Sequence, residues 1–243
     1  MPTATDSRGI LYVATGERYI RAAMRSAESV RRHCEGLRVH LFADWPSHAF
    51  AFDRSPEPFH AVGVIENPHR RSKVEYMARS PFERTLFLDT DTAVVANISD
   101  IFNLLDAFDV ALGHAHKRND AASRAVWRTA LPTAFPEYNS GVFLYRKSEP
   151  VLELFREWQE AFANAGLRKD QPTLRELLWH SSLRIATLPP EYNIRYLKYL
   201  PVWKRSEASP KILHLRRFHE DGFWSLHRKA DHLVHWLRPG GSR

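Results

Sequence analysis

Short apolar runs alternate with amphipathic stretches along most of the chain, which predicts strands and helices in turn. Residues 9–15 form an apolar run rich in β-forming side chains, typical of a buried strand. Apolar residues then recur at helical spacing between Tyr19 and His33, and residues 37–42 alternate as in a strand. This strand–helix–strand order favours a parallel sheet with a right-handed crossover.

The same alternation continues toward the C-terminus. Further strands are expected at 61–65, 85–88, 109–113, 141–146 and 211–215, and helices at 72–79, 149–163 and 172–179. A final amphipathic helix would place Leu226, Ala230, Leu233 and Leu237 on one face. Residues 44–70 are expected to be mostly loop, and no internal repeat is found. The pattern predicts one α/β domain over residues 1–243 rather than two domains.

Composition narrows the class of protein. The chain has 243 residues, and its hydrophobic content of 44% argues against global disorder. Its one cysteine, Cys34, excludes an intrachain disulfide and a cysteine zinc site. Residues 1–8 lack the apolar run of a signal peptide, and no apolar stretch approaches the roughly 20 residues of a membrane span. We therefore expect a cytoplasmic protein.

The positive charge is concentrated in one part of the chain. The net charge is +7, and residues 195–243 carry eleven Lys and Arg against four Asp and Glu, so the remainder is balanced. Such an excess suits a nucleotide diphosphate, an anionic lipid surface or a nucleic acid. Aromatic residues lie among these cations, as in proteins that bind single-stranded nucleic acid: Trp203, Phe218, Phe223, Trp224 and Trp236.

We favour a basic C-terminal segment, residues 195–243, that packs on the rest of the domain. The alternative is a basic amphipathic helix near Arg228 and Lys229 that lies peripherally on the anionic inner face of a membrane. Nucleic acid is the less favoured partner.

Two carboxylates follow a predicted buried strand. Asp89 and Asp91 flank Thr90 directly after Leu86-Phe87-Leu88. Ligands of open α/β sheets bind at the carboxyl ends of strands, and two carboxylates so close together repel each other unless a cation joins them. Mg²⁺ or Mn²⁺ takes oxygen ligands and can bridge carboxylates to a diphosphate. The plainer alternative is a solvated acidic loop near the turn at Asn97.

Six segments follow one another along the chain: the first strand ending at Ala14-Thr15, Arg71-Ser72-Lys73, Asp89-Thr90-Asp91, Asn139-Ser140-Gly141, Asp170-Gln171 and Ile212-Leu213-His214. In this order they resemble the GT-A class of nucleotide-sugar glycosyltransferases. The resemblance spans about residues 9–216 and is closest to the glycogenin-like, family-8-type retaining enzymes.

The resemblance implies a GT-A-like (Rossmann-like) α/β/α sandwich with a mainly parallel mixed sheet. It implies an Mn²⁺ or Mg²⁺ ion held by Asp89, Asp91 and His214, and a nucleotide-diphospho-sugar donor, with UDP as the nucleotide, as co-substrate. Donor contacts would also come from Ala14, Thr15, Lys73, Thr90 and Gly141. Catalytic residues orienting the sugar would be Asn139, Asp170 and Gln171. The acceptor would be a glycan, a lipid-linked molecule or another molecule, and the sequence does not identify it.

The chain departs from this class after His214. The family-8-type enzymes continue with a Gly and a Lys-Pro-Trp stretch, whereas Arg216-Arg217-Phe218 and later Gly222-Phe223-Trp224 stand here. We expect Arg216 or Arg217 to bind the diphosphate instead, because a guanidinium group fits phosphate oxygens. An inverting enzyme would need a carboxylate base, for which Asp170 and Glu137 are the candidates.

Plainer alternatives exist for several of these residues. His214 could be a core histidine, with His219 as a substitute ligand, and Asp170 could be a helix N-cap. Asn139 could be a turn residue, and Lys73 could be a solvated helix residue.

Three other functions stay open on the sequence. Haloacid-dehalogenase-type phosphotransferases also place Asp-x-Asp after a strand and would use Asp89 as nucleophile, but they have Thr or Val where Ala93 stands. A non-catalytic nucleic-acid-binding protein would depend on the basic segment. A non-catalytic nucleotide-sugar-binding protein would keep the donor site without transferring the sugar.

Overall fold

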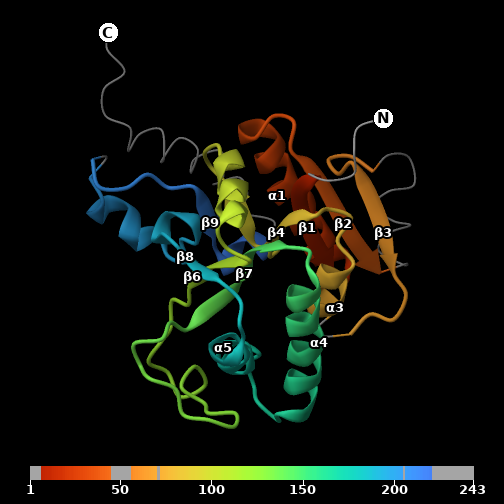
Figure 1. Cartoon of the computed structure of the whole chain (residues 1–243). Helices are drawn as coiled ribbons and strands as arrows, with labels where there is room; N and C mark the ends of the chain where they lie inside the picture. The colour runs from red at the N-terminus through yellow and green to blue at the C-terminus, as the bar shows by residue number, and fades with distance from the viewer. Residues whose placement is uncertain (1–6, 45–55, 70–71, 205, 221–243) are drawn as a thin grey trace.

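A seven-stranded sheet with the strand order β3-β2-β1-β4-β7-β6-β8 runs through the computed structural model (Figure 1). The structure describes residues 7–44, 56–69, 72–204 and 206–220. The strands of this sheet are β1 (Arg8–Ala14), β2 (Arg38–Asp44), β3 (Ala61–Ile65), β4 (Arg84–Leu88), β6 (Val110–His114), β7 (Tyr138–Arg146) and β8 (Ile185–Leu188). A separate two-stranded sheet pairs β5 (Thr92–Val94) with β9 (Ile212–His214).

The large sheet is mainly parallel, as predicted. β1 pairs in parallel with β2 and β4, β2 with β3, and β6 with β8, whereas β7 is antiparallel to both of its neighbours, β4 and β6. The sequence pattern missed β5 and β8, because strands of three or four residues are too short to show alternation. It also began β7 three residues late.

Helices cover both faces of the sheet (Figure 1). On one face lies α1 (Glu17–His33), and on the other lie α3 (Ser72–Ala78), α4 (Glu149–Asn164) and α5 (Gln171–His180). Successive side chains of a strand point to opposite faces, and β1 follows this rule. Ile10 of β1 packs in the cluster that contains α1, and Leu11 packs in the cluster that contains α4 and α5. The predicted α/β/α sandwich is therefore confirmed.

A third apolar cluster joins the late part of the chain to the segment after β4. Its members are buried and come from the β5 region and from residues 194–218: Ala93, Val95, Ile194, Leu200, Leu213, Leu215 and Phe218. The late segments are short 3-10 helices, η2 (Pro190–Tyr192), η3 (Leu197–Val202) and η4 (Arg216–His219), and an earlier one, η1 (Ser99–Asp106), follows β5. The predicted final helix around Leu226–Leu237 lies outside the described residues, as do Arg71, Phe223, Trp224, Arg228, Lys229 and Trp236.

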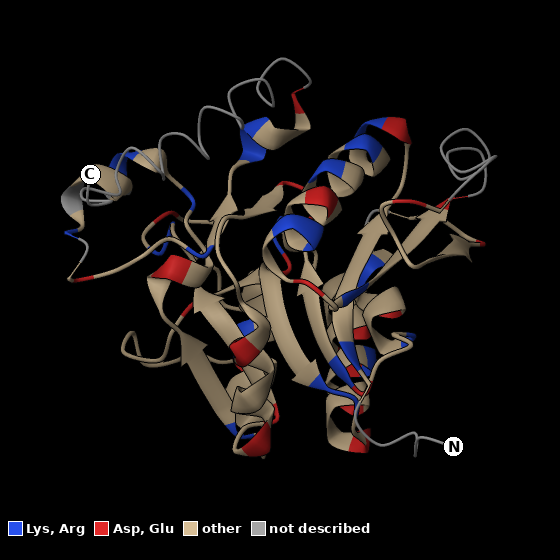
Figure 2. Cartoon of the chain, turned by 90° about the horizontal axis from the view of Figure 1, so that it is seen from above, with Lys and Arg blue, Asp and Glu red and all other residues tan. Residues whose placement is uncertain are grey.

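Basic side chains are also found outside the C-terminal fifth of the chain. Figure 2 looks down on α1 and shows Lys and Arg along that helix. Arg18 Nε donates a hydrogen bond of 3.1 Å to the backbone carbonyl of His219, and Arg25 Nη2 donates one of 3.5 Å to that of Phe218. The basic face of α1 therefore contacts η4.

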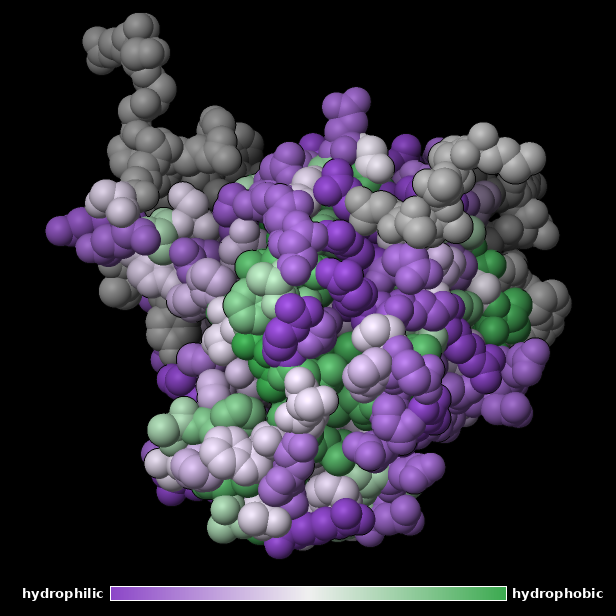
Figure 3. Space-filling model, in the orientation of Figure 1, coloured by the Kyte–Doolittle hydropathy of each residue, from purple (hydrophilic) through white to green (hydrophobic). Residues whose placement is uncertain are grey.

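Hydrophobic residues on the face shown in Figure 3 gather near its middle, with hydrophilic residues above them. Within the part of the chain that the structure describes, no helix combines the length and apolar character needed to cross a membrane.

Candidate functional site

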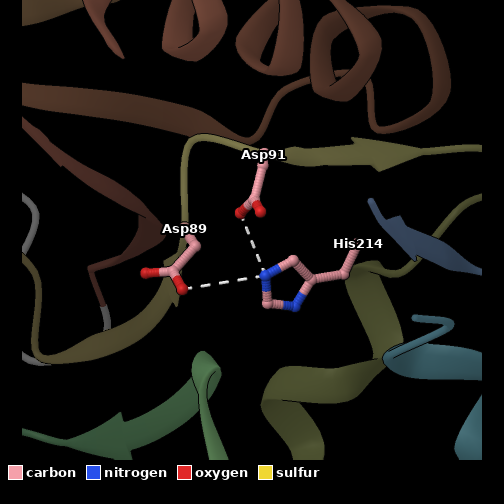
Figure 4. Close-up of side chains that lie close together, drawn as sticks. All are labelled: Asp89, Asp91 and His214. Carbon is pink, nitrogen blue, oxygen red and sulfur yellow. Dashed lines mark ion pairs between the residues drawn. The ribbon is translucent and has the colours of Figure 1, made fainter. Parts of the chain in front are cut away.

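Asp89 and Asp91 lie in the turn between β4 and β5, and His214 is the last residue of β9. The antiparallel pairing of β5 with β9 sets Thr92 opposite His214. The backbone N–H of Leu215 then donates a hydrogen bond of 2.9 Å to the carbonyl of Asp91. This non-local pairing carries the imidazole of His214 to the two carboxylates, and Figure 4 shows the ring pointing at both.

The three side chains form a compact donor set. His214 Nε2 lies 3.0 Å from Asp91 Oδ1 and 3.7 Å from Asp89 Oδ2 (Figure 4). One ligand atom from each residue lies within 4.8 Å of the others. His214 and Asp91 are buried, whereas the side chain of Asp89 is 30% exposed, so the set is accessible on one side. Two carboxylate oxygens and one imidazole nitrogen suit Mn²⁺ or Mg²⁺.

The imidazole of His214 is held in the orientation of a metal ligand. Its Nδ1 lies 2.8 Å from Asn193 Oδ1, and because an amide oxygen only accepts hydrogen bonds, Nδ1 is the protonated nitrogen. Nε2 is buried and makes no hydrogen bond. A lone pair facing two carboxylates is unfavourable without a cation between them. An outer hydrogen bond that fixes a histidine ligand is usual around bound metals, so these residues fit a divalent ion.

Gly141 of β7 leaves room for this cluster. A Cβ atom at this position would collide with His214 Cε1 and with Asp89 Oδ2. The backbone N–H of Asp89 donates a hydrogen bond of 2.8 Å to the carbonyl of Gly141, so β7 passes directly against the first carboxylate. The glycine therefore permits the close approach of backbone and ligands.

Two cations contact the carboxylates from either side. Lys73 Nζ of α3 lies 3.4 Å from Asp89 Oδ1 and 3.0 Å from Ser140 Oγ, and its side chain is 17% exposed, so it is not a solvated helix residue. Arg195 Nη1 lies 3.9 Å from Asp91 Oδ2. Burial by itself would raise the pKa of Asp91, but the charge of the Arg195 guanidinium helps to hold that pKa below its ordinary value. Asp91 is consequently ionised at neutral pH.

A cavity of about 850 Å³ is lined by residues that neighbour the three candidate ligands; we call it the basic cavity. Five of its lining residues carry a positive charge and one carries a negative charge, which suits an anionic ligand. The lining residues are Ala115, His116, Lys117, Asp120, Ala121, Ala122, Asn139, Arg168, Lys169, Gln171, Arg195, Tyr196 and Arg216.

The predicted sugar-orienting residues lie at or near this cavity. Asn139 and Gln171 line it, and Asn139 Oδ1 also accepts a hydrogen bond of 3.2 Å from the N–H of Gly141. Asp170 is buried and occupies the N-cap position of α5, but its side chain makes no capping hydrogen bond. The backbone carbonyl of Asp170 accepts a hydrogen bond of 3.0 Å from Trp158 Nε1.

The structure separates the two adjacent arginines of η4. Both residues are exposed, but Arg216 lines the basic cavity, whereas Arg217 Nε lies 3.5 Å from Glu220 Oε2. His219 is not part of the donor set, and its Nε2 lies 2.9 Å from Thr90 Oγ1.

Ala14 is the last residue of β1, and Thr15 follows it. Neither residue lines the basic cavity. Next to them, the N–H of Gly16 donates a hydrogen bond of 2.6 Å to Asp44 Oδ1.

Sequence reasoning missed Asn193 and Arg195. They flank Ile194, which forms a single parallel bridge with Leu213 beside β9. The alternation of polar and apolar residues from 192 to 196 is the signal that could have revealed this segment, although one bridge carries too little pattern to stand out.

Comparison with known protein families identifies the family of this chain. A sequence model of the family described as nucleotide-diphospho-sugar transferase matches residues 84–235, more than half of the chain. The matched region contains Asp89, Asp91, Asn139, Asp170 and His214. A search of curated proteins finds no similar sequence.

Proposed function

Because the chain belongs to the nucleotide-diphospho-sugar transferase family, we propose that it transfers a sugar from a nucleotide-diphospho-sugar, most simply a UDP-sugar, to the hydroxyl group of an acceptor, with Mn²⁺ or Mg²⁺ as cofactor. The observation that carries this proposal is the Asp89–Asp91–His214 cluster beside a cavity rich in Lys and Arg. A divalent ion and a diphosphate need this combination of anionic ligands and cationic neighbours.

Each part of the cluster has a role in the proposal. Asp89, Asp91 and His214 hold the ion, which when bound neutralises charge on the departing diphosphate. Arg195 and Arg216 bind the diphosphate oxygens through their planar guanidinium groups.

The remaining residues position the donor. Lys73 holds Asp89 through its contact of 3.4 Å, and Gly141 keeps the ligands uncrowded. The sugar is oriented by Asn139, Asp170 and Gln171, and further donor contacts come from Ala14, Thr15 and Thr90. Retention of anomeric configuration, as in the glycogenin-like enzymes, belongs to the same proposal.

Thermal unfolding in the presence of UDP, GDP, CDP or dTDP, each with and without Mn²⁺, tests the donor site. A ligand at about 100 times its Kd adds about 2.7 kcal/mol to stability. For a chain of this size, that corresponds to a rise in Tm of roughly 5–10 °C. We expect such a rise with one nucleotide only, and only with Mn²⁺. Asp91→Asn should abolish it.

Asp106→Asn is the matched control, because Asp106 is an exposed aspartate paired with Arg84 at the opposite end of β4, and it should leave the rise unchanged. The proposal fails if no nucleotide raises the Tm, or if Asp91→Asn responds like the unmodified chain. A nucleotide that raises the Tm although its sugar donor is neither transferred nor hydrolysed would identify a non-catalytic binding protein. Binding of beryllium fluoride to the Asp89 carboxylate, as an analogue of an aspartyl-phosphate, would support the phosphotransferase alternative.

A further inference from the structure

A second cavity, of about 590 Å³, shares part of its wall with the basic cavity; we call it the tryptophan cavity. The shared residues are Ala115, His116 and Arg195. The complete lining is His114, Ala115, His116, Arg118, Thr187, Leu188, Pro189, Pro190, Asn193, Ile194, Arg195 and Trp203. Two cavities that meet at a common wall can hold two reactants side by side.

The tryptophan cavity also adjoins the candidate metal ligands. Asn193 lines it and binds His214 Nδ1 at 2.8 Å. Arg195 lines it and reaches Asp91 Oδ2 at 3.9 Å. A single side chain, Asn193 or Arg195, therefore separates a molecule in this cavity from the cluster of candidate metal ligands.

One part of the lining is apolar. Leu188 and Ile194 are buried, Pro189 and Pro190 are exposed, and Trp203 is half-buried and packs against the third apolar cluster. An indole ring held in this way offers a flat apolar surface that suits the C–H face of a sugar ring.

The polar part of the lining is cationic. Among the described residues that line this cavity there is no Asp or Glu, whereas Arg118 and Arg195 both belong to it. Burial, with the nearby arginines, lowers the pKa of His114 and His116, so the positive charge at neutral pH comes from the arginines. Arg195 is already paired with Asp91, whereas Arg118 Nη1 lies 3.5 Å from His114 Nδ1. The Arg118 guanidinium therefore favours a carboxylate or phosphate ligand.

Building on the proposed function, we infer that the tryptophan cavity binds the acceptor, and that the acceptor is an anionic saccharide, a sugar that carries a carboxylate or a phosphate. Its ring stacks on Trp203, and its charged group binds Arg118. A hydroxyl oxygen of the acceptor forms a bond to the anomeric carbon of the donor sugar, and the bond from that carbon to the diphosphate oxygen breaks. The electron pair leaves with the nucleoside diphosphate, and the hydroxyl proton is released to the departing diphosphate.

Calorimetric titration of the full chain, loaded with Mn²⁺ and the nucleotide diphosphate that raises its Tm, tests this inference. The probes are glucuronic acid and glucose 6-phosphate, which carry the two kinds of anionic group, and glucose as the neutral match. We expect at least one charged sugar to bind about tenfold or more tightly than glucose. Tighter binding of glucuronic acid would identify a carboxylate as the group recognised, and tighter binding of glucose 6-phosphate would identify a phosphate.

Two substitutions separate the parts of the inference. Arg118→Gln should weaken binding of the charged sugar about tenfold, toward the affinity for glucose, because a hydrogen bond between charged groups is lost. Trp203→Ala should weaken charged and neutral sugars alike. The controls are Arg156→Gln and Trp179→Ala, which replace exposed residues of α4 and α5 and should leave sugar binding unchanged.

The inference is overturned if glucose binds as tightly as the charged sugars, if Arg118→Gln has no effect, or if no charged sugar binds at roughly 10 mM. The rise in Tm caused by the nucleotide is measured on the same samples. If that rise is absent, the proposed function itself has failed. If the rise is present and the charged sugars do not bind, only the acceptor inference has failed.

Discussion

Glu137 is a buried carboxyl that directly precedes β7, and its surroundings link its titration to folding. Its Oε2 lies 3.8 Å from Arg175 Nε, and its Oε1 makes no hydrogen bond. Burial raises the pKa of Glu137 to about 7, against the opposing effect of Arg175. The charged groups around it are Asp120, Arg124, Lys169, Asp170, Arg175 and Glu176.

This environment predicts a loss of stability as the pH rises. The ordinary pKa of the group is 4.5, so between this value and about 7 the folded chain binds more protons than the unfolded chain. The stabilisation is complete below the lower pKa and disappears as the pH rises through the higher one. Glu137→Gln removes the titrating group, so its stability should fall less between about pH 5 and pH 8 than that of the unmodified chain, by up to about 3 kcal/mol.

Urea unfolding at the two pH values measures this difference. Glu157→Gln, at an exposed position on α4, is the control and should behave like the unmodified chain. An equal pH dependence in Glu137→Gln and the unmodified chain would show that the carboxyl titrates normally.

At the scale of secondary-structure elements, η4 places adjacent arginines in different surroundings. Both residues are exposed, but Arg216 lines the basic cavity and Arg217 lies beside Glu220. α1 contacts the same short helix through Arg18 and Arg25. The geometry of η4 therefore selects one of two chemically identical side chains for the site.

Arg216→Ala and Arg217→Ala form a matched pair for this selection. Arg216→Ala should weaken nucleotide diphosphate binding in Mn²⁺ about tenfold or more, because a hydrogen bond to a charged group contributes about 1.5–3 kcal/mol. Arg217→Ala should change the affinity by no more than about twofold, as expected for an exposed ion pair. Calorimetric titration measures both, and an equal loss in the two variants would contradict the assignment of Arg216.

α1 also positions the segment that follows the carboxylates. Tyr12 Oη and Ser26 Oγ lie 2.8 Å apart, and Ser26 Oγ lies 2.9 Å from Thr92 Oγ1 of β5. The N–H of Val94 donates a hydrogen bond of 2.8 Å to Ser29 Oγ. These buried hydrogen bonds fix β5, and with it the turn that contains Asp89 and Asp91.

At the scale of the whole molecule, the site is assembled from segments far apart in the sequence. The turn after β4, the start of β7 and the segment from 193 to 216 meet at the cluster. Binding of Mn²⁺ and a nucleotide diphosphate should link these segments more tightly, because a ligand that binds the folded state opposes local opening.

Hydrogen–deuterium exchange tests this link. With Mn²⁺ and the nucleotide, exchange should slow in residues 89–95, 193–195 and 212–216 together. Exchange in α4 should stay unchanged, because this helix lies on the other face of the sheet from α1 and contributes no residue to the basic cavity. Slowing of only one of the three segments would show that they do not share a ligand.

The sequence by itself determined the layers of the fold and the types of residue in the candidate site. The alternation of strands and amphipathic helices is a local signal, because burying one face of an element requires apolar residues at its period. It predicted β1, β2, β3 and α1 closely. The carboxylates after β4 were recognised because they directly follow the apolar run of that strand. The extent of the domain over residues 1–243 stays a prediction.

Only the tertiary structure decided how these residues meet. The pairing of β5 with β9, the hydrogen bond from His214 to Asn193, the choice of Arg216 over Arg217 and the shared wall of the two cavities are all non-local. Neighbours in space that are 20 or more residues apart leave no period in the sequence. Their positions follow from packing of the whole chain, and the chemistry of the site depends on distances that this packing alone sets.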